Sequence, residues 1–418
     1  MNNFSELKEY ASSFGVTLSE GNTEVLSTSL TVEGKNIPNR LLIQPVEGTD
    51  ADENGNPGEL TKRRYLRYAK GGAGTIWFEA VALSSDFRSN KRQLILDEKT
   101  VDEFSRIVEN VKETAIKENG YEPILIVQIT NPGRTCLLSK PAYENYMWEK
   151  VSSSHNQPIV SDDEIARLSS VYGDSAKLAK KAGFDGVEVK ACHRTFINEL
   201  LAARAKPGRY GGSFENRVRH LTESLAAVRA KTDNMIVTVR LNHYDGIPYP
   251  NGFGMKDDGS PTPDGTEPIK LIKELHNEYG IELINCSSSN PSFELFENKS
   301  CDNPLFTEPM NAVKTAGIMH LFAKEIKNNI PEVKVVATNF SYFKQYGATI
   351  GAGIIERNEA DLIGFGRQGL AYPDFAKDIL INGKMDEKKV CIYCGGCNRM
   401  MGSAKGAGCI AYDEVYKN

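Results

Sequence analysis

Residues 185–217 of the chain read DGVEVKACHRTFINELLAARAKPGRYGGSFENR. The stretch opens with the short apolar pattern of a buried strand at 186–189. Reactive side chains follow directly, namely Lys190, Cys192, His193 and Arg194, and an amphipathic helical pattern and a Gly-rich turn come next. A barrel of eight parallel strands builds its active site at the carboxyl ends of those strands. This unit therefore predicts such a barrel and places the chemistry after one of its strands.

Similar strand patterns repeat along the chain from Arg40 onward. We expect eight strands, at 41–45, 75–80, 124–129, 186–189, 236–241, 283–286, 333–338 and 362–366. Helical patterns follow them, for example at 101–117, at 162–182 with Ser161 as the N-cap, at 214–229 and at 312–327. Such alternation indicates a parallel sheet with crossover helices. It favours an α/β fold of the (β/α)8 TIM-barrel type, with an open doubly wound sheet as the alternative.

The chain divides into three parts. Residues 1–39 read as a helix or loop and a short hairpin, which we expect to cap the barrel. Residues 40–385 form the barrel, and residues 386–418 form a cysteine-rich C-terminal segment. The longest insertions follow the third and fifth strands and carry aromatic side chains. These form either walls of a substrate site or ordinary packed loops: Tyr143, Tyr146, Trp148, Tyr244, Tyr249 and Phe253.

Composition limits the possible environments and partners. The 418 residues are 40% hydrophobic and 25% charged, which is enough to bury a large core. The net charge is −5 and no basic block is present, so nucleic acid and anionic membrane surfaces are poor partners. The first residues lack the pattern of a signal peptide, and no apolar run is long enough to span a bilayer. We expect a cytoplasmic protein.

Four of the eight cysteines crowd the C-terminal segment. Cys391, Cys394, Cys397 and Cys409 form the array C-x2-C-x2-C-x11-C. Four thiolates in a tight, glycine-containing loop suit a 4Fe–4S cluster, and they equally suit a tetrahedral zinc ion. A reducing compartment disfavours disulfides. The spacing alone leaves the two metals open.

Several motifs resemble those of the old yellow enzyme family. They are Val187-Glu188-Val189, the run 196–201, the turn 210–217, and Gly364-Phe365-Gly366-Arg367 with the residues that follow it to Phe375. The resemblance covers nearly the whole chain. It is nearest to the iron–sulfur branch of that family, which includes 2,4-dienoyl-CoA reductase and trimethylamine dehydrogenase. It implies an FMN-dependent oxidoreductase on a TIM barrel.

The same resemblance implies which residues hold the FMN. Arg240, at the end of the fifth strand, matches the arginine beneath the N1–O2 edge of the flavin, and Gln128 matches the glutamine that meets its pyrimidine ring. Backbone groups at the first two strand ends edge the flavin, and the loops after strands 7 and 8 hold its phosphate. These further positions are Pro45, Val46, Ala80, Asn339, Phe340, Gly366 and Arg367.

The sequence departs from the family at the proton donor. Relatives carry a His/His or His/Asn pair after strand 4, and a tyrosine two residues later protonates the substrate. Here Lys190 and His193 stand at the pair and Thr195 stands at the tyrosine. The two donors can polarise a carbonyl or hold a carboxylate, but Thr195 is a poor acid. The proton could instead come from His193, Tyr244, Cys192 or water.

The position of the cysteine array favours iron. It begins directly after the eighth helical pattern, where the iron–sulfur branch carries its cluster, so the resemblance implies a 4Fe–4S cluster rather than zinc. Larger relatives continue into FAD- and NAD-binding domains, and we find no built-in dinucleotide fingerprint here. Electrons are then expected from NAD(P)H or from an external electron-transfer protein. Family barrels often pair, and we expect the segment 210–217 or the C-terminal tail to carry any contact between copies.

The main hypothesis is an ene-reductase that passes a hydride from FMN to an electron-poor C=C bond of a small molecule. Lys190, His193 and Tyr244 are the candidate catalytic residues. A second hypothesis is a flavin- and iron–sulfur-dependent dehydrogenase that oxidises an amine-like substrate. A third is a flavin-free, zinc-stabilised barrel lyase that uses Lys190, since a lysine at a strand end can form a Schiff base. The last is an electron-transfer or binding protein without chemistry of its own.

Overall fold

A computed structural model describes residues 3–135, 141–143, 145, 158–260, 262–288, 312–401, 403 and 405–417. Eight parallel strands close into a barrel in the order β10-β3-β4-β5-β6-β7-β8-β9. They are β3 (Leu41–Ile43), β4 (Thr75–Ala82), β5 (Ile124–Thr130), β6 (Gly186–Ala191), β7 (Ile236–Asn242), β8 (Leu283–Ser287), β9 (Lys334–Ala337) and β10 (Leu362–Phe365). The TIM barrel is confirmed, and closure rules out the open doubly wound sheet.

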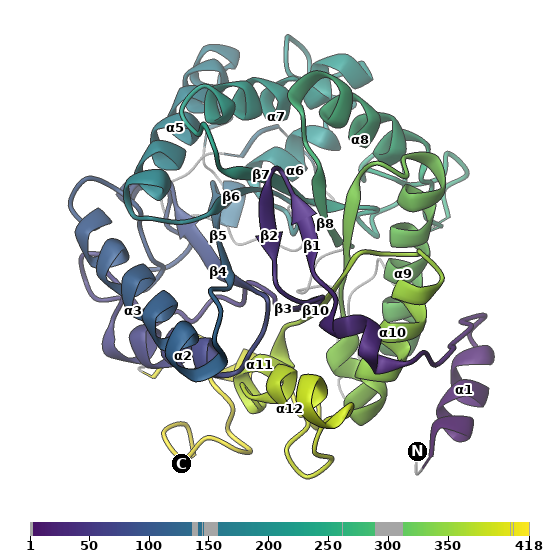
Figure 1. Ribbon diagram of the computed structural model, residues 1–418. Helices are drawn as coiled ribbons and strands as arrows, with labels where there is room; N and C mark the ends of the chain where they lie inside the picture. The colour runs from purple at the N-terminus through teal and green to yellow at the C-terminus, as the bar shows by residue number, and fades with distance from the viewer. Residues whose placement is uncertain are drawn as a thin grey trace.

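The helices surround the barrel as an outer ring (Figure 1). The longer ones are α2 (Glu59–Lys70), α3 (Val101–Asn119), α5 (Asp162–Lys181), α7 (Phe214–Arg229), α8 (Thr266–Tyr279), α9 (Ala312–Asn329) and α10 (Gly347–Glu356). The shorter ones are α1 (Phe4–Ser12), α6 (Phe196–Leu201), α11 (Arg367–Ala371), α12 (Phe375–Asn382) and α13 (Gly396–Met400). Short 3-10 turns are η1 (Thr23–Ser27), η2 (Ser85–Phe87), η3 (Gly133–Thr135) and η4 (Phe340–Tyr346). Among the described helices, none is long and apolar enough to cross a membrane.

The start of α5 shows how a local signal fixes an element. Ser161 Oγ accepts a hydrogen bond from the Glu164 backbone N–H, and a Glu164 carboxylate oxygen accepts one from the Ser161 N–H. This reciprocal capping box satisfies two backbone donors that no helical carbonyl can reach. It explains why the expected N-cap is correct.

Replacing Ser161 with alanine should lower the free energy of unfolding by about 1 kcal/mol, because the Glu164 N–H loses its acceptor. Urea denaturation would measure the change. Ser170→Ala is the matched control, since this serine is exposed in the middle of the same helix and alanine suits that position. Equal stability of the two variants would contradict the assigned cap.

The N-terminal hairpin covers the amino end of the barrel (Figure 1). Its strands are β1 (Leu30–Val32) and β2 (Lys35–Ile37), which pair antiparallel. Val32 and Ile37 are fully buried and pack with apolar residues of the barrel strands, among them Trp77 and Ile126. The barrel interior is therefore apolar at this end. Polar side chains gather at the opposite, carboxyl end, where the cavity lies.

The strand ends differ slightly from the expected ones. β3 stops at Ile43, two residues before Pro45. A proline has no N–H to donate to a ladder, so a strand ends more readily before it. β4, β6 and β7 run one or two residues further than the expected ranges, to Ala82, Ala191 and Asn242.

The C-terminal segment packs against α2 and against the loop after β3. Arg63 and Arg67 of α2 both pair with Asp413, whose carboxylate is almost fully buried. The Ala407 N–H donates to the carbonyl of Gly48. The segment is thus fastened at two places and lies along the carboxyl end of the barrel.

Candidate functional site

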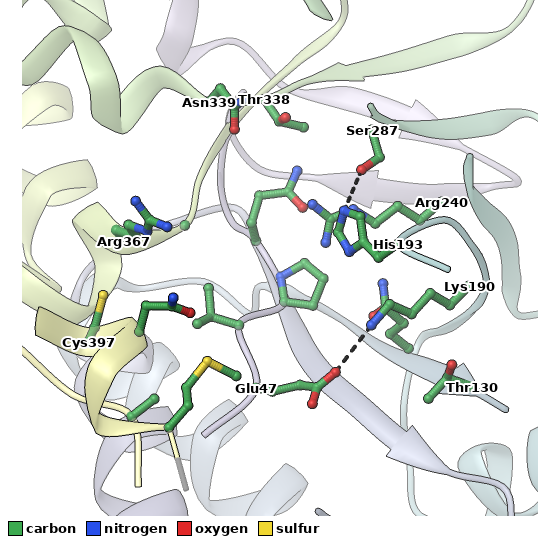
Figure 2. Close-up of a pocket in the computed structure, with 18 of the residues that line it drawn as sticks. Glu47, Thr130, Lys190, His193, Arg240, Ser287, Thr338, Asn339, Arg367 and Cys397 are labelled. Carbon is green, nitrogen blue, oxygen red and sulfur yellow. Dashed lines mark hydrogen bonds and ion pairs between the residues drawn. The ribbon is translucent and has the colours of Figure 1, made fainter. Parts of the chain in front are cut away.

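A cavity of about 490 Å³ opens at the carboxyl end of the barrel. Figure 2 shows Lys190, His193 and Arg240 on one side of it and Arg367 and Cys397 on the other. Most of the predicted cofactor and catalytic residues line this cavity: Pro45, Val46, Gln128, Lys190, His193, Arg240, Asn339, Gly366 and Arg367. Residues spread over more than 300 positions of sequence are therefore brought to one site.

Three predicted residues lie outside the cavity lining. Ala80 is buried beside a register shift in β4, and its carbonyl accepts a hydrogen bond from Gln93, which does line the cavity. Phe340 is fully buried and stacks on His320 in the core. Tyr244 is buried in the loop after β7. The structure does not bring these three side chains to the site.

The aromatic residues of the two long insertions give a similar result. Of the described ones, Tyr143, Tyr249 and Phe253 are absent from the cavity lining. Arg204 lies over the Tyr249 ring, and Phe253 is fully buried. They belong to packed loops rather than to a substrate wall. Tyr146 and Trp148 lie outside the described residues.

Arg240 is placed to meet a ligand. In the described part of the chain its guanidinium makes no hydrogen bond or ion pair, and its Nε is buried without an acceptor. The hydroxyls of Thr130 and Ser288 line the same cavity and are likewise buried without a hydrogen-bond partner there. Buried polar groups that stay unpaired are costly. Their convergence fits a cavity that receives a ligand rich in hydrogen-bonding groups, as FMN is.

Lys190 is held by a residue that the sequence analysis missed. Its Nζ lies 3.2 Å from a carboxylate oxygen of Glu47, and the Lys190 side chain is only 9% exposed (Figure 2). Glu47 follows Pro45 and Val46 directly and lines the cavity with them. Its position just after the end of the first barrel strand could have predicted that Glu47 lies at the site. The pairing itself joins residues 143 positions apart, which no local pattern reveals.

His193 sits in a turn with unusual backbone geometry. It and Arg194 both have positive φ angles, 59° and 61°. The turn brings His193 Nε2 to 2.8 Å from the hydroxyl of Ser287 at the end of β8 (Figure 2). Burial, together with the nearby cations Arg240 and Lys190, lowers the pKa of His193 well below its usual range. The imidazole is therefore neutral at pH 7 and can act as a hydrogen-bond donor or acceptor.

The other proton donors considered are less well placed. Thr195 Oγ1 donates to backbone carbonyls, at 2.9 Å from that of Cys192 and 3.2 Å from that of Lys190. Cys192 is fully buried, does not line the cavity, and has its pKa raised to about 11 by burial. Neither group is free to give a proton to a molecule in the cavity.

A buried polar network lies one layer below the cavity. Glu188, on β6, accepts hydrogen bonds from Gln128 at 2.6 Å and from Asn285 at 2.8 Å. Asn285 in turn exchanges hydrogen bonds with Gln44. The sequence analysis used Glu188 only as part of a motif and missed Gln44 and Asn285. Side chains alternate along a strand, so Glu188 and Lys190 point to the same side of β6. This alternation could have predicted that Glu188 lies below the site.

The C-terminal segment closes one side of the cavity. Tyr393, Cys397, Asn398, Met401 and Ala407 line it. The Arg367 guanidinium lies 4.4 Å from the centre of the Tyr393 ring, and Tyr342 packs on that ring at 4.0 Å. The cysteine-rich segment is thus part of the same site.

The four cysteines of the array surround a second, smaller cavity. Arg367, Tyr393 and Cys397 line both cavities, so the two adjoin. Burial and the neighbouring cysteines raise the pKa of Cys391 to about 11. Within the described ranges, no group of three or more His, Cys, Asp or Glu side chains is placed to hold a metal ion.

The chain is similar in sequence to known flavin oxidoreductases. The NADH-dependent flavin oxidoreductase iliE of Neonectria sp. (strain DH2) is 26% identical over 382 residues, which are 85% of this chain and 46% of that protein. The NADPH dehydrogenase of Clostridium acetobutylicum is 26% identical over 363 residues, 82% of this chain and 91% of that protein. The chain thus spans about half the length of the first relative and most of the second.

Among solved structures, a 2-naphthoyl-CoA reductase in complex with 2-naphthoyl-CoA shares the fold. The TM-score is 0.76 at 18% identity, covering 94% of this chain and 58% of that one. The family model described as NADH:flavin oxidoreductase / NADH oxidase matches residues 26–284, more than half of the chain. The chain therefore belongs to the NADH:flavin oxidoreductase / NADH oxidase family, the old yellow enzymes, which are FMN-dependent oxidoreductases.

Proposed function

We propose that the protein is an ene-reductase, which adds a hydride and a proton across an electron-poor C=C bond of a small molecule. The observation that carries the proposal is that Lys190 and His193 face one cavity beside Arg240 (Figure 2). A carbonyl or carboxylate conjugated to a C=C bond is activated by donors that withdraw electron density from its oxygen. The ammonium of Lys190 and the neutral imidazole of His193 are such donors.

The cavity residues fit FMN. Arg240 and Gln128 would hold the pyrimidine edge, and Arg367 with the backbone at Asn339 and Gly366 would hold the phosphate. Arg240 and Arg367 lie on opposite sides of the cavity (Figure 2), as an elongated ligand with two polar ends requires. Bound FMN would supply the hydride. Arg240 would stabilise negative charge on the reduced flavin, because a cation near N1 and O2 offsets it.

We propose that the four cysteines hold a 4Fe–4S cluster. They line one small cavity together, and this cavity adjoins the one proposed for FMN. The array spacing suits four iron-bound thiolates as well as it suits one zinc ion, and its place directly after the barrel, as in the iron–sulfur branch of the family, favours iron. The donor would be NAD(P)H, as in the named relatives, or a protein that delivers electrons at the cysteine-rich segment.

A substrate screen in both directions tests the proposed function. Holoenzyme reduced anaerobically with dithionite would be mixed with 2-cyclohexenone, cinnamaldehyde and cinnamate, and oxidised holoenzyme with primary, secondary and tertiary amines. We expect an activated alkene to reoxidise the flavin. Reduction of the flavin by an amine, with no alkene active, would favour the dehydrogenase instead. The cysteine spacing, which resembles that of trimethylamine dehydrogenase, is the reason to include it.

Replacing Lys190 with methionine should raise the KM for an active carbonyl-conjugated alkene by about 10- to 100-fold, because a charge-assisted hydrogen bond is lost. Steady-state kinetics would measure it, with FMN content as a check that the site is intact. Lys117→Met, on the exposed face of α3, is the control. An unchanged KM would remove Lys190 from substrate binding. A substrate trapped on Lys190 by borohydride in flavin-free protein would favour the zinc-stabilised lyase.

A further inference from the structure

We propose that Glu188 is a positioning residue that orients Gln128 toward the flavin, and that its buried charge, near that of Arg240, helps to set the flavin reduction potential. The inference rests on the proposed FMN site. It concerns a residue that does not line the cavity, and it acts through two residues that do.

The contacts of Glu188 fix its carboxylate from two sides. The side chain is fully buried. Gln128, on the neighbouring strand β5, is its register partner and donates from Nε2 at 2.6 Å. Asn285, on β8 two strands further along the barrel wall, donates from Nδ2 at 2.8 Å. Since an amide that gives its N–H₂ to Glu188 must turn its carbonyl elsewhere, Glu188 decides which end of Gln128 is presented to the cavity.

The network continues to a third part of the barrel wall. Gln44, directly after β3, donates to Asn285 at 3.0 Å and accepts from it at 3.2 Å, and Gln44 lines the cavity. Glu188 is therefore the single charged member of a chain of four side chains, Gln44, Asn285, Glu188 and Gln128. A buried network in which every member is satisfied holds its groups rigidly.

Glu188 also acts on Arg240 through charge. Arg240 follows on β7, where it is the register partner of Lys190, two residues beyond Glu188. Burial raises the pKa of Glu188 to about 7, while Arg240, the hydrogen bonds from Gln128 and Asn285, and Lys190 act to lower it. The positive charges of Arg240 and Lys190 lower the pKa of Glu188. The charge of Glu188 in turn raises the pKa of the Cys192 thiol. When ionised, Glu188 offsets part of the positive charge of Arg240.

Arg240 and Glu188 should shift the flavin reduction potential in opposite directions. Reduction places negative charge on the flavin, and Arg240 favours that charge while Glu188 opposes it. Removing the charge of Glu188 should therefore make the bound FMN easier to reduce. Removing Arg240 should make it harder to reduce. If the two substitutions only damaged the site, they would not be expected to shift the FMN reduction potential in opposite directions.

The test compares FMN midpoint potentials of purified holoenzyme variants at pH 8, measured by anaerobic spectroelectrochemical titration. We expect Glu188→Gln to shift the potential to more positive values and Arg240→Ala to shift it to more negative values. Glu188→Asp keeps the charge and should stay nearer to the wild-type potential than Glu188→Gln does. A Glu188→Gln potential equal to or below that of the wild type would overturn the proposal.

Glu79→Gln is the matched control. Glu79 is also a buried glutamate at a barrel strand, and burial raises its pKa to about 7 as well. Its carboxylate instead pairs with Arg64 of α2 and accepts from the Gly48 N–H, away from the cavity lining. Glu79→Gln should shift the FMN midpoint potential less than Glu188→Gln does. An equal shift would show that the loss of any buried carboxylate charge changes the potential, wherever it lies in the barrel. Wild-type protein that takes up no FMN would instead refute the proposed function itself.

Discussion

Arg240→Ala should weaken FMN binding by about 10- to 100-fold, because the loss of one charge-assisted hydrogen bond to a ligand costs about 1.5–3 kcal/mol. Arg240 lines the cavity, and its Nε is buried without an acceptor in the described part of the protein, so a ligand in the cavity can supply one. Titration of apoprotein with FMN, followed by flavin fluorescence, measures the affinity.

Two further variants separate charge from geometry at this position. Arg240→Lys retains the cation but not the planar fork of the guanidinium, so it should keep more of the reduction potential than of the affinity. Arg106→Ala removes an exposed arginine of α3 and should leave both unchanged. Flavin content and potential that are unaffected in Arg240→Ala would show that the arginine has another role.

Cys394→Ser should abolish the proposed 4Fe–4S cluster. Cys394 is the exposed member of the four, and a 4Fe–4S cluster in this array has no spare thiolate among them. We expect iron and acid-labile sulfide to fall to background in anaerobically purified protein, together with the broad visible absorption. Cys286→Ala, which changes a buried cysteine of β8 outside the array, should keep its iron. Full retention of iron in Cys394→Ser would show that the array was misread.

Much of the barrel could be predicted because strand and helix periodicities are local. The apolar pattern at 186–189 and the N-cap at Ser161 depend on a few neighbouring residues, and both are found as expected. Parallel strands also carry a simple rule, since their carboxyl ends meet at one face. That rule is enough to bring Gln128, Lys190 and Arg240 to one cavity.

What could not be predicted depends on contacts between distant parts of the chain. The Lys190–Glu47 pair joins β6 to the loop after β3, the Glu188–Asn285 hydrogen bond joins β6 to β8, and neither has a local signature. The stacking of the Phe340 ring on His320 in the core is another contact without a local signature. The backbone contact expected at Phe340 with the flavin phosphate stays a prediction.

The central claim is that one chain carries FMN and a 4Fe–4S cluster side by side. The most direct test is a visible absorption spectrum of anaerobically purified protein, with iron, acid-labile sulfide and zinc assayed on the same sample. We predict flavin bands on a broad iron–sulfur shoulder, with about four irons per chain. A colourless protein with one zinc ion, which takes up neither added FMN nor iron, would contradict the account.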